Sequence, residues 1–286
     1  MLDRSVPGLL PNLLIIGAGK AGTTSLHAYL DEHPQIAMSK EKELELFSGT
    51  DWQERLDWYR ANFLVRAPVR GESSPSYSMD PVLGQVPERA RTVVPGARIV
   101  YMVRDPIERL LAHYVEYVAI GIEKRSFADA IADYDAPSNI YVMSSRYAHQ
   151  LDRWREHYPD SRIMVVDQRE LLSDRREVLR DVFAFLGVDD DYWTPEFDRL
   201  HNTRQRKMRV NGAGMGAYRI GLYDPLVRAA AALPERWRRR VLSVMGDEIR
   251  RPVPDDALRN ELEACVREDA DRLRAYTGKP FDHWTV

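Results

Sequence analysis

The sequence predicts an α/β fold in which helices cover both faces of a parallel sheet, followed by a helical C-terminal extension. Three short segments indicate the strands, at residues 13–16, 98–103 and 162–166, and each is apolar apart from the arginine that opens the second and the third. Uninterrupted apolar runs of this length are typical of strands that are buried on both faces. Segments with helical periodicity lie between and after them, and strands that alternate with helices favour a parallel sheet.

The first strand leads into a glycine-rich turn and then a helix. Residues 13–16 end at Gly17, and apolar side chains recur at helical spacing over residues 26–30. We expect the helix to stop at His33-Pro34, because a proline disfavours helical geometry at the residue before it.

The second and third strands repeat this arrangement. Residues 98–103 run into Arg104-Asp105-Pro106, and the apolar spacing predicts a helix from residue 107 to about residue 120. An amphipathic helix over residues 147–158 precedes the third strand, and a helix that ends at Gly187 follows it.

The C-terminal part differs from the rest of the chain in composition and in the pattern of apolar residues. After Asn202 come a basic loop at residues 204–209 and a glycine-spaced stretch at residues 212–216. A last helix is expected to start near residues 254–256, with its apolar face formed by Leu258, Leu262, Val266 and Leu273.

Composition and charge exclude several classes of protein. Hydrophobic residues make up 44% and charged residues 30%, as in ordinary globular proteins. The 41 Lys and Arg are balanced by 44 Asp and Glu, so the net charge of −3 predicts no nucleic-acid partner. Seven scattered histidines and a lone Cys265 show no metal-ligand spacing, so no metal is expected. We also expect no signal peptide and no membrane span, and hence a cytoplasmic protein.

The turn after the first strand has the features of an anion-binding loop. Residues 17–25 read Gly-Ala-Gly-Lys-Ala-Gly-Thr-Thr-Ser and lie between a strand and a helix, where backbone N–H groups and the positive helix end favour a phosphate. A Walker A loop needs Lys directly after its second glycine, but Thr23 occupies that position here. Lys20 lies inside this P-loop-like turn, from where it can reach a phosphate held by N–H groups at residues 22–24. The alternative is a tight connection without a ligand.

Four segments together resemble the sulfotransferases that use 3′-phosphoadenosine 5′-phosphosulfate (PAPS), especially the branch with heparan-sulfate and many bacterial members. They are residues 17–26, Lys42-Glu-Leu-Glu-Leu-Phe47, the predicted turn Gly71-Glu-Ser-Ser-Pro-Ser-Tyr77, and residues 104–114. Weaker similarity continues to Trp284. The resemblance implies a single sulfotransferase domain over residues 1–286, with an α/β nucleotide-binding layer in residues 1–200 and the basic loop and helical part in residues 201–286.

The resemblance also implies a reaction and a set of site residues. A sulfuryl group would pass from PAPS to a hydroxyl or amine of a small-molecule, sugar or lipid acceptor, leaving adenosine 3′,5′-bisphosphate and requiring no metal. Lys20 would steady the leaving oxygen, Glu43 would be the general base, and Glu45 would contact the acceptor. The residues expected to bind the nucleotide are Lys20, Ala21, Gly22, Thr23, Thr24, Ser25, Arg104, Arg206, Lys207 and Arg209.

Two positions depart from the family pattern. Ala112 stands where the family places a phosphate-binding serine eight residues after Arg104. Ser73 follows Glu72 where the heparan-sulfate branch has a lysine. The absence of this lysine argues against a heparan-like acceptor more than against PAPS as the donor.

Other interpretations stay open at the level of sequence. A P-loop-type kinase would need ATP and magnesium, and a non-catalytic nucleotide-binding relative would keep the loop without the base. Residues 42–45 also fit a solvated charged segment, residues 104–109 an ordinary helix start, and Arg109 a structural role. The basic residues 236–240 beside an apolar run fit a helix hairpin or a peripheral lipid contact. Nothing in the sequence indicates an oligomeric state.

Overall fold

The central element is a sheet of five parallel strands. In the computed structural model these are β2 (Ile36–Met38), β3 (Val69–Ser73), β1 (Leu13–Gly17), β4 (Arg98–Val103) and β5 (Ile163–Asp167), in that spatial order. The structure describes residues 9–199, 208–210 and 246–286, with a few residues between 229 and 244. All residues of β1 are buried, as the continuous apolar run predicts.

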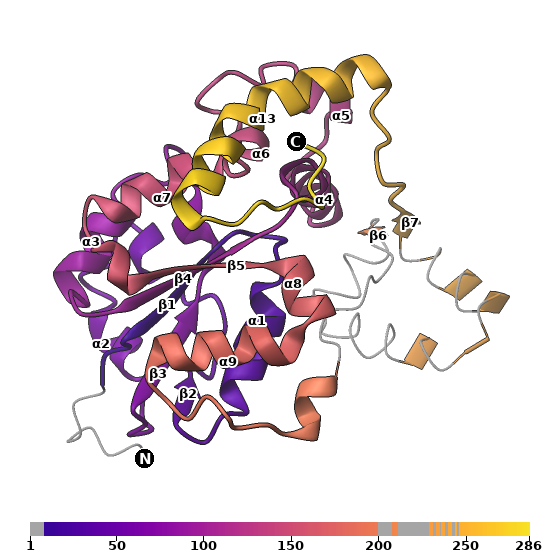
Figure 1. The fold of residues 1–286 in the computed structure, drawn as a ribbon. Helices are drawn as coiled ribbons and strands as arrows, with labels where there is room; N and C mark the ends of the chain where they lie inside the picture. The colour runs from indigo at the N-terminus through magenta and orange to yellow at the C-terminus, as the bar shows by residue number, and fades with distance from the viewer. Residues whose placement is uncertain are drawn as a thin grey trace.

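Helices flank the sheet on both sides, which confirms the predicted fold class. Figure 1 shows α1 and α9 on one side of the sheet, and α7 with α13 on the other. The α-helices are α1 (Thr23–Asp31), α2 (Leu56–Arg60), α3 (Val86–Val93), α4 (Pro106–Ala119), α5 (Phe127–Ile131), α6 (Ile140–Met143), α7 (Tyr147–Arg155), α8 (Gln168–Ser173), α9 (Arg175–Leu186) and α13 (Asp256–Thr277). Short 3-10 turns are η1 (Leu46–Ser48), η2 (Pro75–Ser78), η3 (Asp160–Arg162) and η4 (Pro195–Asp198).

The three predicted strands and the helices beside them form where the sequence places them. Helix α4 begins at Pro106 because the Asp105 carboxylate caps it, accepting from the Glu108 N–H at 2.8 Å. Helix α9 ends at Gly187, whose φ of 69° suits the left-handed cap.

Two strands of the parallel sheet, β2 and β3, were not predicted, and the position of β3 corrects an expectation. Strand β2 is apolar but has only three residues, and β3 shows no apolar run because it carries Arg70, Glu72 and Ser73. We expected a turn from Gly71 to Tyr77, but residues 71–73 belong to β3 and the turn η2 starts at Pro75. Strand β3 lies between β2 and β1, and hydrogen bonds from three hydroxyl groups satisfy its buried Glu72 carboxylate.

The C-terminal helix α13 packs against α7 and α4. Leu262, Val266 and Leu273 are buried as predicted, whereas Leu258 is only partly buried. The Asp269 carboxylate accepts from the N–H groups of Ala148 and His149, both at 2.8 Å, and so caps the start of α7. These contacts attach the C-terminal helix to the α/β layer.

The segment after α13 runs back to the carboxyl ends of the strands (Figure 1). The Thr285 N–H donates to Asp105 after β4, at 2.6 Å, and the Trp284 indole donates to Asp167 at the end of β5, at 3.1 Å. Trp284 also stacks on Phe281, with ring centroids 4.3 Å apart.

Strands β6 (Met208–Val210) and β7 (Gly246–Glu248) form an antiparallel pair. Most of residues 226–240 lies outside the described residues, so the predicted helix hairpin or lipid contact there stays a prediction, as does the single domain over residues 1–286. Within the described ranges, no helix is both long enough and apolar enough to cross a membrane.

Candidate active site

The predicted anion loop joins β1 to α1. Its backbone has positive φ at Gly17 (140°), Lys20 (70°) and Gly22 (93°). A side chain at Gly17 would bring its Cβ within 2.0 Å of Ser78 Oγ, so glycine is required there. Gly22 is the N-cap of α1, and within the described structure no side chain caps this helix. The Ser25 N–H donates to the Gly22 carbonyl oxygen at 3.0 Å, so the N–H groups that precede it in the first turn are the ones that suit an anion.

Lys20 and Arg104 lie together, as the sequence predicts. Arg104 Nη1 donates to the Lys20 carbonyl oxygen at 3.4 Å, which places the guanidinium beside the loop. The Lys20 ammonium forms an ion pair with Glu116 of α4, with Nζ 2.8 Å from Oε2. The Arg104 guanidinium and the backbone of Lys20 thus lie together at the carboxyl ends of β1 and β4, where α/β sheets commonly hold ligands.

A third cation, Arg251, was not anticipated from the sequence. Arg251 lies just after β7, and its Nη2 is 2.8 Å from Glu108 Oε1, while Arg104 Nη2 is 3.0 Å from Glu108 Oε2. Burial raises the pKa of Glu108, but Arg251 and Arg104 outweigh it and hold this pKa below its ordinary value. Arg251 and Arg104 thus share the Glu108 carboxylate although they lie far apart along the chain, and no local motif marks this arrangement.

The basic loop predicted to close over the nucleotide is mostly outside the described residues. Arg206 and Lys207 are not described, and Arg209 lies in β6, where its backbone pairs with Asp247 of β7. Their role in nucleotide binding stays a prediction.

Glu43 and Glu45 are fixed at the carboxyl end of β3. The Glu43 N–H donates to the Ser73 carbonyl oxygen at 3.1 Å, and the Glu45 N–H donates to Ser74 Oγ at 3.0 Å. The Glu43 side chain is 49% exposed and forms an ion pair with Lys42. Burial, and then the nearby Glu43 carboxylate, raise the pKa of Glu45. The predicted base is thus open to solvent, and the predicted acceptor contact lies beside it.

A buried carboxylate, Glu72, is linked through Ser74 to the backbone of the segment that carries Glu43 and Glu45. It is fully buried on β3 and accepts hydrogen bonds from Tyr59 OH at 2.5 Å, Ser74 Oγ at 2.8 Å and Tyr77 OH at 2.9 Å. Burial raises the pKa of Glu72, although these hydrogen bonds lower it. Because Ser74 also accepts from the Glu45 N–H, Glu72 organises the backbone under Glu45.

A cleft of about 470 Å³ opens beside Glu43. In the wall of this cleft, the Arg55 guanidinium stacks over the Trp58 ring, with Cζ 4.4 Å from the ring centroid, and Trp58 is 40% exposed. The lining residues are Glu41, Glu43, Leu44, Glu45, Ser48, Gly49, Arg55, Trp58 and Leu83. The cleft therefore joins the predicted base to a surface that can hold a second substrate.

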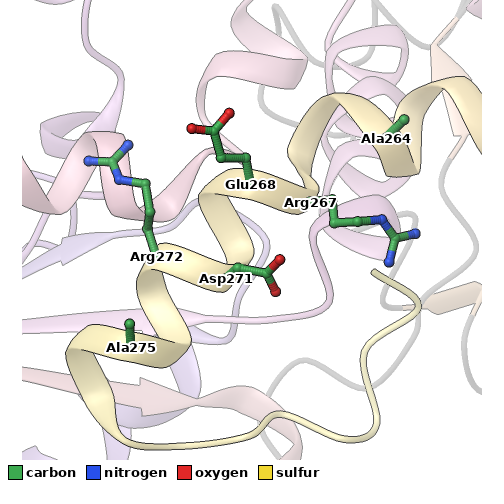
Figure 2. A pocket seen from close by; sticks show the side chains of 6 residues that line it. All are labelled: Ala264, Arg267, Glu268, Asp271, Arg272 and Ala275. Atoms are coloured by element: carbon green, nitrogen blue, oxygen red, sulfur yellow. The ribbon is translucent and has the colours of Figure 1, made fainter.

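A second hollow, of about 500 Å³, lies along α13 (Figure 2). It is lined by side chains of that one helix, of which two are arginines and two are carboxylates, and none is a residue predicted for the site. Its lining residues are Ala264, Arg267, Glu268, Asp271, Arg272 and Ala275. We therefore place the candidate site at the loop and at the cleft beside Glu43.

Comparison with known families shows which family the chain resembles. Residues 10–214 match the model of the sulfotransferase domain. The chain belongs to the sulfotransferase family. This span contains the loop, Arg104 and the Glu43 segment, so it includes the residues from which the family was predicted.

Two relatives of this sulfotransferase are bifunctional heparan sulfate N-deacetylase/N-sulfotransferases. Number 3 from Homo sapiens is 30% identical over 202 residues, and number 1 from Caenorhabditis elegans is 29% identical over 195 residues. The alignments cover 64% and 63% of this chain but 23% and 22% of those proteins. The chain thus spans less than a quarter of the length of these relatives.

Solved structures agree with the fold of this sulfotransferase. A sulfotransferase from Alicyclobacillus acidocaldarius superposes with a TM-score of 0.67 at 25% identity, covering 97% of this chain and 100% of that one. The sulfotransferase domain of the Synechococcus PCC 7002 olefin synthase has a TM-score of 0.52 at 16% identity, covering 93% and 97%. The second likeness supports the fold alone.

Within the described part of this sulfotransferase, no group of three or more His, Cys, Asp and Glu side chains is arranged to hold a metal ion.

Proposed function

We propose that this sulfotransferase transfers a sulfuryl group from PAPS to a hydroxyl or amine of a small-molecule, sugar or lipid acceptor. The observation that supports the proposal most is the hydrogen bond from Arg104 to the Lys20 carbonyl oxygen, which places a guanidinium beside the loop, at a helix start that no described side chain caps. PAPS carries a 5′-phosphosulfate and a 3′-phosphate, so it needs cations at two neighbouring points. The loop with Lys20 suits the first group, and Arg104 with Arg251 suits the second.

Sulfuryl transfer resembles phosphoryl transfer, in which positioning and charge stabilisation supply most of the catalysis. Lys20 would stabilise negative charge on the leaving phosphate oxygen. Its ion pair with Glu116 holds the ammonium near the loop. Glu43 would accept the proton of the acceptor as the new S–O or S–N bond forms.

The charge of the cleft favours some acceptors over others. Glu41, Glu43 and Glu45 line it, whereas Arg55, its lining cation, stacks on Trp58 and donates to the Leu44 carbonyl oxygen. Such a surface repels a polyanion and suits a neutral or amine-bearing acceptor. We therefore propose an acceptor that is not itself highly sulfated.

Calorimetry with adenosine 3′,5′-bisphosphate tests the donor. We expect binding without magnesium, and we expect Arg104→Ala to weaken it by about tenfold, the effect of losing one charged hydrogen bond. Arg180→Ala is the control, because Arg180 forms an exposed pair with Glu177 on the surface of α9. Tighter binding of ATP, or an absolute need for magnesium, would contradict the proposal and favour a kinase.

A transfer assay tests the acceptor. Radiolabelled PAPS is incubated with panels of amines, sugars, phenols and lipids, and transfer must be lost in Glu43→Gln. Binding of the bisphosphate without transfer to any acceptor class would instead indicate a non-catalytic nucleotide-binding relative.

A further inference from the structure

Arg109 is a fully buried guanidinium directly behind the anion loop. Its Nε donates to the Gly19 carbonyl oxygen at 3.0 Å, and its Nη1 donates to the Tyr141 carbonyl oxygen at 3.0 Å and to Ser145 Oγ at 3.3 Å. Its Nη2 is buried and has no hydrogen-bond partner within the described structure. All its partners are neutral oxygens.

The side chains around Arg109 carry no compensating negative charge. Tyr101, Tyr117 and Tyr147 face it, and burial raises the pKa of each phenol, so all three are neutral. Burial, then Arg109 and Lys20, lower the pKa of His113 well below its ordinary value, so this imidazole is neutral too. Throughout the described ranges, no carboxylate lies within 4 Å of the Arg109 guanidinium.

The two neighbouring cations differ from Arg109 in this respect. Lys20 is paired with Glu116, and Arg104 is paired with Glu108. A buried charge without a partner is costly to fold, because it loses its hydration and gains no ion pair. Arginine cannot escape the cost by losing its proton, since its pKa is too high. The charge of Arg109 is therefore permanent, and an anion at the loop would supply a counterion for it.

We propose that Arg109 is a fixed positive charge behind the loop that raises the affinity for the anionic groups of the donor without touching them. The proposal depends on the proposed function only for the identity of the anion. In a partly buried site the attraction between charges falls slowly with distance, so a guanidinium bonded to the Gly19 carbonyl can act on a ligand at the opposite side of the loop. Arg109 is thus a positioning residue that also supplies charge.

Two substitutions separate charge from shape. Arg109→Gln keeps hydrogen-bond donors but loses the charge, and Arg109→Lys keeps the charge but loses the planar fork. We measure the affinities of both variants for adenosine 3′,5′-bisphosphate, adenosine 5′-monophosphate and uncharged adenosine at pH 6.5. We expect Arg109→Gln to lose about tenfold or more for the bisphosphate, less for the monophosphate and nothing for adenosine. Arg109→Lys should stay within about threefold of the wild type for all three ligands.

Equal losses for all three ligands would overturn the proposal, because they would mean that Arg109 only holds the loop in shape. So would wild-type bisphosphate affinity in a folded Arg109→Gln. If Arg109→Gln does not fold, Arg109→Lys decides: a tenfold loss for the bisphosphate with unchanged adenosine affinity contradicts a role for charge. Failure of the proposed function is distinguishable, because the wild type would then not bind the bisphosphate.

Discussion

Three residues assigned to the chemistry have an uncommon backbone conformation. Lys20, Glu43 and Glu45 have φ values of 70°, 63° and 50°, in the left-handed region that side chains rarely adopt. Such conformations cost about 1–2 kcal/mol each and persist where the surroundings hold them. Hydrogen bonds from the Glu43 and Glu45 N–H groups to Ser73 and Ser74 hold the backbone at these two positions, which indicates that the fold determines its conformation there.

The role of Glu43 as general base is tested by Glu43→Gln. The amide keeps the shape of the side chain but cannot accept a proton, so turnover should fall by ~10²–10⁴-fold. Nucleotide affinity should stay near that of the wild type, because Glu43 pairs with Lys42 and not with Lys20 or Arg104. Steady-state kinetics and calorimetry check both expectations.

Glu45→Gln is the matched control for this substitution. Glu45 lies two positions away and lines the same cleft, so its loss should mainly raise the KM for the acceptor. Loss of turnover in Glu45→Gln but not in Glu43→Gln would contradict the role of Glu43 and indicate that Glu45 is the general base. Full activity in both variants would show that the acceptor reacts without a protein base.

Single residues of the site differ in how far the sequence can predict them. Lys20 and Arg104 come shortly after strands that the sequence predicts, whereas Glu43 is predicted from the resemblance of residues 42–47 to a family segment. Arg251 and Glu116 come from distant segments and are recognised only by their contacts. Arg109 lies in a predicted motif, but its lack of a counterion depends on neighbours from other elements.

At the scale of elements, strands β1, β4 and β5 were predictable and β2 and β3 were not. Apolar runs identify a strand when both of its faces meet helices. Strand β3 escapes this rule because Glu72 replaces an apolar side chain, and three hydroxyl groups satisfy its carboxylate. Two of these hydroxyl groups belong to Tyr59 and Tyr77, which reach Glu72 only in the folded chain. A local sequence pattern therefore cannot show that a carboxylate is tolerated inside this strand.

The connection between α4 and α5 depends on the Glu123 carboxylate. It accepts from the backbone N–H groups of Lys124 and Arg125, both at 2.9 Å, from Arg125 Nη2 at 2.8 Å and from Tyr141 OH at 2.9 Å. The hydrogen bonds from Arg125 are the main reason why the pKa of Glu123 falls to about 2 from its ordinary 4.5. The charged form is therefore the one that stabilises the fold.

This shift makes the contribution of Glu123 to stability dependent on pH. Because its pKa is lower in the folded state, the contribution is complete above about pH 4.5 and is lost as the pH falls toward about 2. Glu123→Gln should lower the free energy of unfolding by about 1–3 kcal/mol at pH 7, and the difference from wild type should shrink below pH 4.5. Urea unfolding at several pH values measures it.

Glu177→Gln is the control, because Glu177 forms an exposed pair with Arg180. Its loss should change stability little at any of these pH values. A pH-independent difference for Glu123→Gln would mean that its packing, and not its charge, supports the connection.

At the scale of the whole molecule, the segment after α13 holds the C-terminal helix to the sheet edge that carries the site. Its Thr285 N–H and Trp284 indole donate to Asp105 and Asp167, the carboxylates that follow β4 and β5. Asp105 comes directly after Arg104, so this attachment ends next to the predicted nucleotide site.

Trp284→Ala tests how much this attachment contributes. Trp284 is only 7% exposed and stacks on Phe281, so its removal should cost about 3–5 kcal/mol of unfolding free energy. Trp284→Phe keeps a ring for stacking and should cost clearly less. Trp58→Ala, at an exposed ring in the cleft, is the control for stability. Equal midpoints of urea unfolding for Trp284→Ala and Trp58→Ala would show that the segment does not stabilise the fold.

The distances along the chain that these contacts span bear on the order in which the protein assembles. Asp105 and Thr285 are 180 positions apart, and Asp167 and Trp284 are 117 apart. Closing long loops costs conformational entropy, and chains that depend on distant contacts fold slowly. We expect the strands and the loop to come together first and the final segment to dock late. A newly made chain would then reach full nucleotide affinity only when this last step is complete, which would let ligand binding serve as a readout of finished folding.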